Sequence, residues 1–325
     1  MVFGLIYRRQ DVSIRHVFFW CFCVIIEGVI LGFEMHTPLG FCTPLKGKRL
    51  DCMIKLIATD MDGTFLRSDK TYDKARFSSL LTLMEKYDIK FVAASGNLYD
   101  QLLLNFLEYP NRIAYVAENG GRVIDQDGTL LKETYLSNDT VAAVLSYLYQ
   151  NYPETLISLS GEKRSYLERR TPINRRTELE YYMPNFIYKD HLLPLDDDRY
   201  FQMTLWVNEN LVSEMLLDIS EHFKNHHIRL TSSGFGCIDV LPADVNKADG
   251  IAILLEKWGL KQDQVMVFGD GGNDVEMLRA ANISYAMSNA PEEIKAIAKY
   301  QTVSNDQDGV LETIENFLHK MSDNE

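Results

Sequence analysis

The sequence predicts an α/β protein in which a doubly wound parallel β-sheet is interrupted by an inserted α/β domain. Two observations predict this fold class. Short apolar, β-branched segments alternate with segments of helical periodicity, and each apolar segment runs into polar residues and glycine. Between residues 136 and 241 the alternation changes its rhythm, and from residue 247 it resumes. Such alternation is typical of a parallel sheet that binds ligands at the carboxyl ends of its strands.

The first part of the predicted core covers residues 53–135. Apolar, β-branched segments predict its strands, and apolar residues at helical spacing predict the helices between them. The expected elements are a strand at 54–59, a helix at 71–87, a strand at 90–94, a helix at 98–107, a strand at 113–117 and a turn at 119–121.

The insertion, expected to form an α/β cap, covers residues 136–241, and the core resumes over 242–325. In the insertion we expect helices at 140–150, 175–182 and 211–222, and strands at 156–159, 165–167, 201–207, 228–231 and 237–241. The second part of the core is expected to contain a helix at 247–258, a strand at 264–268, a helix ending at 281 and a strand at 284–287.

Composition excludes several classes of protein. The net charge of −13 repels a polyanion, so nucleic-acid binding is not expected. After residue 52 the chain contains a single cysteine, Cys237, so no disulfide framework can hold the main body together. We therefore expect a cytoplasmic protein.

The first 52 residues differ from the rest. Residues 17–33 form an apolar run that Glu27 interrupts and arginines precede, as in a signal peptide or membrane anchor. The run is short for a membrane span, which needs about 20 residues, and no small-residue cleavage site follows it. Translation that starts at Met53 explains the segment best, and a real anchor is the alternative. Membrane association is expected only if residues 17–33 are an anchor.

Two carboxylates one residue apart, Asp60 and Asp62, follow the first predicted strand of the core. Such a pair suits a site where one carboxylate acts on a substrate and the other transfers protons. A calcium loop is one alternative, but its twelfth position, normally glutamate, is Thr71 here. An incidental acidic loop is the other alternative.

Polar residues also follow three further core segments. Ser95-Gly96-Asn97 offers a hydroxyl and backbone amides that can hold phosphate oxygens, and Lys247 can neutralise a phosphate. The glycine-rich loop 269–274 contains Asp270 and Asp274, the oxygen ligands that hard cations prefer. A helix-capping turn accounts for Asp274 but leaves Asp270 unexplained. Each motif alone is weak, whereas their convergence at one edge of one sheet is specific.

Together these motifs resemble the haloacid dehalogenase-like (HAD) superfamily, in its Cof-type branch with a large α/β cap. The resemblance extends from Met53 nearly to the C-terminus. Within that branch, the motifs are most similar to those of the sugar-phosphate phosphatases. Its motifs are Asp60-Met61-Asp62-Gly63-Thr64-Phe65-Leu66, Phe91-Val92-Ala93-Ala94-Ser95-Gly96-Asn97, Val116-Ala117-Glu118-Asn119-Gly120, Thr231-Ser232-Ser233-Gly234-Phe235-Gly236 and Gly269-Asp270-Gly271-Gly272-Asn273-Asp274.

The resemblance implies a role for each motif residue. Asp60 is the nucleophile that becomes an aspartyl phosphate, and Asp62 is the acid/base. A magnesium ion is held by the Asp60 and Asp270 carboxylates and the Asp62 main-chain carbonyl, and Asp274 orients its water shell. The groups implied around the phosphoryl oxygens belong to Met61, Ser95, Gly96, Lys247 and Asn273.

Substrate contacts are expected from three further residues. Asn97 stands where the wider branch commonly has arginine, and its neutral amide suits a polyhydroxyl substrate better than a bisphosphate. Glu118 and Asn119 are expected either to bind sugar hydroxyls or to form a plain turn. The aromatic residues of the insertion, Tyr181-Tyr182 and Trp206, are expected to serve packing, although an aromatic residue on a cap can also stack on a sugar ring.

We therefore expect a magnesium-dependent phosphatase of small phosphomonoesters, sugar phosphates above all, that acts as a monomer or small homo-oligomer on a small phosphorylated metabolite. A sugar phosphomutase is the first alternative, although the mutases that we compare have a smaller helical cap. The second is a membrane-tethered binding protein without activity, but competent residues occupy all the catalytic positions.

Overall fold

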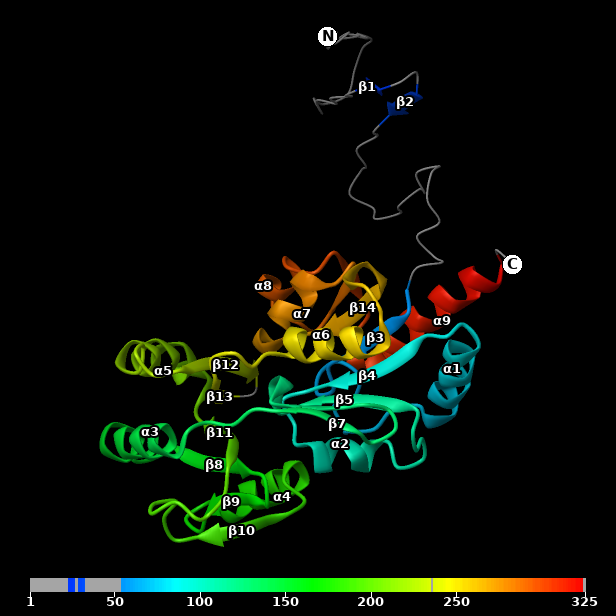
Figure 1. Ribbon diagram of the computed structural model, residues 1–325. Coiled ribbons are helices and arrows are strands. Elements are labelled where there is room, and N and C mark those ends of the chain that lie inside the picture. Colours follow the sequence, from blue (N-terminus) through cyan, green and yellow to red (C-terminus); the bar gives the residue numbers. More distant parts are fainter. Residues whose placement is uncertain (1–22, 27–28, 33–53, 235, 324–325) are drawn as a thin grey trace. The chain divides into compact units, whose positions relative to one another are not determined.

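The computed structural model describes residues 23–26, 29–32, 54–234 and 236–323 (Figure 1). The chain divides into two units, Met1–Arg49 and Leu50–Glu325. In the first unit, β1 (Cys23–Ile26) and β2 (Val29–Gly32) form an antiparallel pair, and the rest of the anchor-like run 17–33 lies outside the described residues. Within the described part of the chain, no helix has the length and apolar character needed to cross a membrane.

The second unit contains an eight-stranded sheet in the order β16-β15-β14-β3-β4-β5-β6-β7. The strands from β16 to β5 are parallel, which confirms the predicted fold class. The bounds are β3 (Leu56–Thr59), β4 (Lys90–Ala94), β5 (Ile113–Ala117), β6 (Arg122–Ile124), β7 (Leu130–Glu133), β14 (Val265–Gly269), β15 (Ile283–Met287) and β16 (Tyr300–Thr302).

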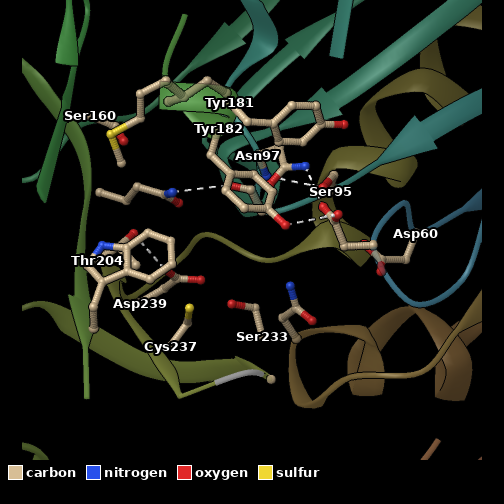
Figure 2. A pocket seen from close by; sticks show the side chains of 18 of the residues that line it. Asp60, Ser95, Asn97, Ser160, Tyr181, Tyr182, Thr204, Ser233, Cys237 and Asp239 are labelled. Atoms are coloured by element: carbon tan, nitrogen blue, oxygen red, sulfur yellow. Dashed lines mark hydrogen bonds between the residues drawn. The ribbon is translucent and has the colours of Figure 1, made fainter. Parts of the chain in front are cut away.

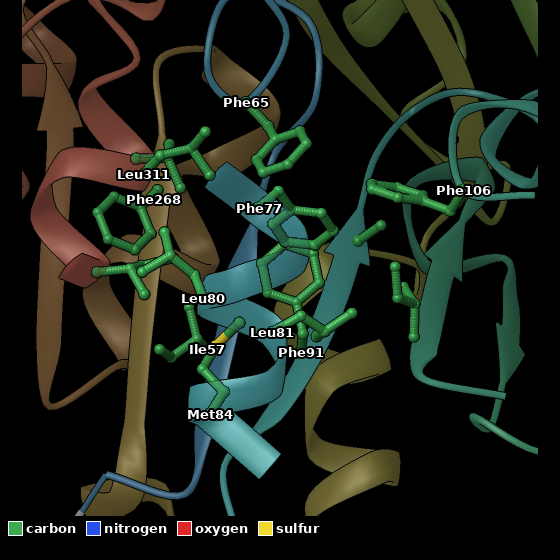
Figure 3. Packing of buried hydrophobic residues seen from close by; sticks show 14 of the residues in the cluster. Ile57, Phe65, Phe77, Leu80, Leu81, Met84, Phe91, Phe106, Phe268 and Leu311 are labelled. Carbon is green, nitrogen blue, oxygen red and sulfur yellow. The ribbon is translucent and has the colours of Figure 1, made fainter. Parts of the chain in front are cut away.

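Helices cover both faces of this sheet. One face packs against α1 (Lys74–Lys86), α2 (Tyr99–Asn105) and α9 (Gly309–Ser322), as Figure 3 shows for Ile57 and Phe91 against Phe77 and Leu80. The other face packs against α6 (Lys247–Trp258), α7 (Val275–Ala280) and α8 (Glu292–Lys295). Because both faces are covered, the central strands are buried along their whole length.

One edge of the sheet differs from the predicted parallel arrangement. Strands β6 and β7 pair antiparallel, β6 with β5 and β7 with β6. A parallel neighbour would need a crossover of a dozen or more residues, whereas only the short turn η2 (Glu118–Gly120) separates β5 from β6. The chain therefore reverses at η2 and extends the sheet as a hairpin.

A second sheet has six strands in the order β10-β9-β8-β11-β13-β12. Its bounds are β8 (Leu156–Gly161), β9 (Ser165–Glu168), β10 (Phe186–Lys189), β11 (Tyr200–Trp206), β12 (Ile228–Gly234) and β13 (Cys237–Pro242). Helices α3 (Asn138–Asn151) and α5 (Glu209–His222) pack on one face, and α4 (Ile173–Tyr182) belongs to a smaller apolar cluster. We call this sheet with α3, α4 and α5 the cap, and the eight-stranded sheet with its helices the core.

Alternation along the cap strands gives the two faces of the cap sheet different characters. Met203 and Leu205 of β11 pack in the apolar cluster under α3 and α5, whereas Gln202 and Thr204 point to the opposite face. Strand β13 repeats the pattern, with Ile238 in the apolar cluster. The cap sheet thus turns a polar face away from α3 and α5. The domain boundaries at 135/136 and 241/242 stay a prediction.

Candidate active site

Asp60 follows β3 directly and is held by a buried lysine. Lys247, the first residue of α6, donates from Nζ to Asp60 Oδ1 at 2.5 Å and to Asp274 Oδ1 at 2.7 Å, and its side chain is 0% exposed. Burial lowers the pKa of Lys247, but Asp274 and Asp60 outweigh burial and raise it. Burial also raises the pKa of Asp60, and Lys247 opposes that rise. The lysine is therefore charged, and it is the cation that stabilises the Asp60 carboxylate.

Three carboxylates gather at this point. Asp60, Asp270 and Asp274 each offer one oxygen, and these oxygens lie within 4.8 Å of one another. Burial, followed by the charge of Asp274, raises the pKa of Asp270 to about 7. Three carboxylates beside the single ammonium group of Lys247 carry two excess negative charges when all are ionised. The buried cluster therefore favours a divalent cation.

The loop after β14 orients these acids. Thr64 Oγ1 donates to Asp270 Oδ1 at 2.5 Å, and the amides of Asp270 and Gly271 donate to Asp274 Oδ2 at 2.9 Å each. Asp274 makes no side-chain cap bond to α7, the helix that follows it. Gly63 has a φ of +78°, and a Cβ there would collide with the Asp270 carboxylate. The Asp60 loop and the Asp270 loop therefore fit together only with glycine at this position.

Asp62 lies two residues after Asp60 but has different neighbours. Lys70 donates to its Oδ1 at 2.6 Å, and Asn97 Nδ2 donates to its Oδ2 at 2.7 Å. The hydroxyl of Tyr182, from the cap, donates to Oδ1 at 3.2 Å. The Asp62 side chain is 17% exposed. Asp62 is thus held at the surface of a cavity by donors from both core and cap.

The loop between β4 and α2 presents Ser95, Gly96 and Asn97 beside the two carboxylates. Ser95 Oγ accepts from the Asn97 amide at 3.1 Å, and the Gly96 carbonyl accepts from Gln202 Nε2 of the cap at 3.0 Å. Asn273, in η4 (Gly272–Asp274), also lines the cavity. Hydroxyl, side-chain amide and main-chain groups therefore line the cavity together with Asp60.

Glu118 and Asn119 do not line the cavity, so the structure does not bring these two predicted substrate residues to the substrate space. Both are buried, and each has a positive φ. Their amides donate to the Asn97 and Ser95 carbonyls at 3.0 Å each, which supports the 95–97 loop. Glu118 Oε1 accepts from the Tyr99 amide at 3.0 Å, and burial raises the pKa of Glu118 to about 8.

The Asn119 side chain links the core to the cap. Its Nδ2 donates to Gln202 Oε1 and Asp239 Oδ2 at 3.2 Å each, and its Oδ1 accepts from Asn273 Nδ2 at 2.9 Å. These contacts occupy the amide that was expected to bind sugar hydroxyls. Asn119 is instead a buried connection between the cavity loops, with 1% of its surface exposed.

A cavity of about 520 Å³ lies between core and cap (Figure 2). Asp60, Asp62, Lys70 and the polar loops described above form its core wall. The cap wall is polar on the sheet and aromatic beside α4. Its residues are Ser160, Thr177, Tyr181, Tyr182, Met183, Gln202, Thr204, Trp206, Ser233, Gly234, Cys237 and Asp239.

The remaining predicted residues lie behind the cavity. Three of them, Lys247, Asp270 and Asp274, lie next to Asp60 but do not line the cavity. The Met61 side chain belongs to the apolar core, so any phosphate contact of Met61 falls to its main chain. The motif residues Asp60, Lys247, Asp270 and Asp274 are thus brought together, as are Asp62 and Asn97.

Several cavity residues were not predicted from the sequence. Lys70 lies in an ordinary-looking charged loop. Tyr181, Tyr182 and Trp206 pack against neighbouring rings, as expected, and they also line the cavity. For Gln202, Thr204 and Asp239 a signal existed: polar residues alternate with apolar ones along β11 and β13, which indicates a polar sheet face with a ligand or solvent beside it.

Comparisons with known proteins agree on one family. The family model described as haloacid dehalogenase-like hydrolase matches residues 57–314. A curated relative from Escherichia coli, named 5-amino-6-(5-phospho-D-ribitylamino)uracil phosphatase, is 39% identical over 265 residues, which are 82% of this chain and 96% of the relative.

Solved structures have the same fold. A protein of Streptococcus mutans matches with a TM-score of 0.79 and 39% identity, over 82% of this chain and 99% of that protein. A sugar phosphatase of HAD subclass IIB matches with a TM-score of 0.68 and 22% identity, over 81% of this chain and 98% of that enzyme. At that identity the second match is one of fold alone.

Proposed function

This chain belongs to the haloacid dehalogenase-like hydrolases, and from that premise we propose that it is a magnesium-dependent phosphatase of small polyhydroxylated phosphomonoesters, sugar phosphates above all. Its class as a phosphomonoesterase follows from the family model and from relatives named phosphatases. One observation carries the proposal. Two carboxylates, Asp60 and Asp62, line one cavity, and a buried lysine holds the first while half-buried donors hold the second.

The first step is phosphoryl transfer to the enzyme. An Asp60 carboxylate oxygen attacks phosphorus, the bond from phosphorus to the ester oxygen breaks, and the electron pair remains on that oxygen. Asp62 gives the departing oxygen its proton. Ser95, the Gly96 amide and Asn273, which line the cavity, hold the phosphoryl oxygens, and Met61 offers only its main chain. Lys247 lies behind the cavity and offsets the phosphoryl charge from its position beside Asp60.

The second step releases phosphate. Asp62, now a carboxylate, takes a proton from water, and the water oxygen attacks phosphorus of the aspartyl phosphate. The bond from phosphorus to Asp60 breaks, which returns a carboxylate to Asp60 and frees inorganic phosphate. Asp62 thus acts as acid and then as base, which requires that it face the cavity, and Asp62 lines it.

The acidic cluster fits Mg²⁺, because three carboxylate oxygens lie within 4.8 Å of one another and one lysine leaves two negative charges uncompensated. Asp60, Asp270 and the Asp62 carbonyl would hold the ion, and Asp274 would orient its water shell. When bound, the ion supplies positive charge that lets an anionic phosphate approach a carboxylate.

Polyhydroxylated substrates are favoured by the chemistry of the cap wall. Gln202, Thr204 and Asp239 line the cavity with amide, hydroxyl and carboxyl groups that also bond one another or the core, and Asn97 adds a neutral amide that bonds Asp62. A second phosphate group on the substrate would instead favour cationic side chains on the cap wall. The Escherichia coli relative is named for a substrate with a phosphorylated ribityl chain, which is likewise a polyol phosphate.

The test is phosphate release from a panel of sugar and polyol phosphates by the full chain. We expect turnover with Mg²⁺, its loss with a chelator, and its return when Mg²⁺ is added back. Asp60→Asn keeps the size of the side chain but removes the nucleophile, so activity should fall at least about a thousandfold. Full activity in Asp60→Asn contradicts the proposal.

Two controls accompany this test. Asp197→Asn makes the same substitution at an exposed cap loop and should leave turnover unchanged. Product analysis separates hydrolysis from the mutase alternative, because a mutase passes the phosphoryl group to another sugar without releasing inorganic phosphate.

A further inference from the structure

We infer that Tyr182, a cap residue, is a positioning residue for Asp62 and orients the acid that protonates the leaving group. The inference rests on the proposed function of Asp62. Tyr182 is the last residue of α4, and its hydroxyl donates to Asp62 Oδ1 at 3.2 Å. Figure 2 shows Tyr182 among the residues that line the cavity.

The hydrogen bonds around this hydroxyl have a definite direction. Lys70 Nζ donates to the Tyr182 oxygen at 2.6 Å and to Asp62 Oδ1 at 2.6 Å. An ammonium group has only donors, so the Tyr182 oxygen must accept from Lys70, and the tyrosine proton is left to point at Asp62. Lys70, Tyr182 and Asp62 therefore form a closed triangle that holds Oδ1, while Asn97 holds Oδ2.

The loop that carries Lys70 is itself held in an unusual conformation. Lys70 has a φ of +65°, which is uncommon for a residue with a side chain. Arg67 pairs with Asp308 through two hydrogen bonds, and Ser68 donates to Asp306 from both its amide and its hydroxyl. These contacts fix the loop to the core and hold Lys70 over Asp62 despite the backbone cost.

Tyr182 is held from the cap side. The Tyr182 ring lies 6.4 Å from the Trp206 ring and 5.1 Å from the Tyr181 ring, measured between ring centroids. On the core side, Lys70 Nζ lies 5.2 Å from the centroid of the Tyr182 ring. Because Asp62 belongs to the core and Tyr182 to the cap, their bond exists only while the cap covers the cavity. Asp62 is then fully oriented in the same state that excludes water from the substrate.

The test uses a series of substituted phenyl phosphates, from p-nitrophenyl phosphate, whose leaving group departs readily as an anion, to phenyl phosphate, whose leaving group needs a proton. These substrates have similar sizes, so they report on proton donation rather than on binding. In Tyr182→Phe, kcat/KM should fall about tenfold for phenyl phosphate and less than about twofold for p-nitrophenyl phosphate. The control, Tyr188→Phe, removes a hydroxyl that bonds Glu180 elsewhere in the cap and should match the parent.

The outcomes separate the two proposals. Asp62→Asn should also lose more kcat/KM for phenyl phosphate than for p-nitrophenyl phosphate, and the difference should be larger than in Tyr182→Phe. An equal loss of kcat/KM across the series in Tyr182→Phe, or no loss, overturns the positioning role while Asp62→Asn still supports the proposed function. Wild-type kinetics in Asp62→Asn overturns both.

Discussion

At the scale of single residues, the structure separates two carboxylates that stand two positions apart. Asp60 faces a fully buried lysine and two further acids, whereas Asp62 contacts Lys70, Asn97 and Tyr182 at the cavity surface. A nucleophile must be ionised, and Lys247 favours the charged form of Asp60. An acid/base must exchange protons with substrate and water, which the position of Asp62 at the cavity surface allows. The proposed roles thus follow from neighbours and not from residue type.

Glu118 gives a residue-scale prediction about pH. Its Oε2 has no hydrogen-bond partner among the described residues, and burial raises its pKa from 4.5 to about 8. Between these two values the folded protein holds a proton that the unfolded chain has lost, so stability falls as pH rises through this window and is level above it. In Glu118→Gln, which keeps the acceptor for the Tyr99 amide, that loss should be absent.

Urea unfolding at pH 5, 7 and 9 measures the effect. Glu118→Gln should equal the parent near pH 5 and exceed its free energy of unfolding by a few kcal/mol at pH 9, with about 5 kcal/mol as the upper limit at 1.36 kcal/mol per pKa unit. Glu293→Gln, at an exposed position of α8, is the matched control and should follow the parent at every pH. A constant difference between Glu118→Gln and the parent argues against the raised pKa.

At the scale of elements, the contact of α6 with β5 positions the lysine of the site. Gly250 of α6 lies against Val116 of β5, and a Cβ at Gly250 would collide with the buried Val116 side chain. The close approach holds the first turn of α6, with Lys247, beside the strand end that leads to Glu118. Alanine generally stabilises a helix more than glycine does, but at position 250 the close packing against Val116 outweighs that preference.

Gly250→Ala is expected to lower the free energy of unfolding by about 1–3 kcal/mol, although alanine at an unconstrained helix position would raise it by about 1 kcal/mol. Thermal and urea unfolding measure the change. Ala252→Gly, at an exposed position of the same helix, calibrates the propensity term and should lose only about 1 kcal/mol. A stabilised Gly250→Ala would show that α6 can shift without cost.

At the scale of the whole molecule, all the described site residues and apolar clusters of the core and cap lie between Ile54 and Met321. The chain from Met53 to Glu325 is therefore expected to fold and act without the preceding residues. Its thermal midpoint should stay within about 2 °C of the full chain, and its kcat within about twofold. Mass spectrometry of the native N-terminus complements this experiment, because a chain that begins at Met53 removes the anchor alternative.

Two outcomes of the truncation are informative. Equal stability and turnover agree with a core and cap that are complete from Met53. A truncated chain that is unfolded or inactive contradicts the expectation and assigns residues 1–52 a structural part in the enzyme.

The sequence by itself determines the parallel part of the core and the motif residues at its strand ends. Strands such as Leu56–Thr59 and Val265–Gly269 are covered on both faces, so they are continuous apolar runs, and the polar residues that follow them stand out. The convergence of Asp60 and Asp270 could be expected because parallel strands end at the same edge of the sheet, whereas Lys247 reaches them from the first turn of α6.

Only the tertiary structure decides how the cavity is lined. The sequence leaves Lys70 and Tyr182 as an ordinary loop lysine and a packing tyrosine, and it leaves Asn119 as either a substrate contact or part of a plain turn. In the fold, Lys70 and Tyr182 meet at Asp62, while Asn119 is buried between Asn273 and the cap. The physical reason is that periodicity reports which face of an element is buried, whereas the partner across a cavity depends on how separate elements pack.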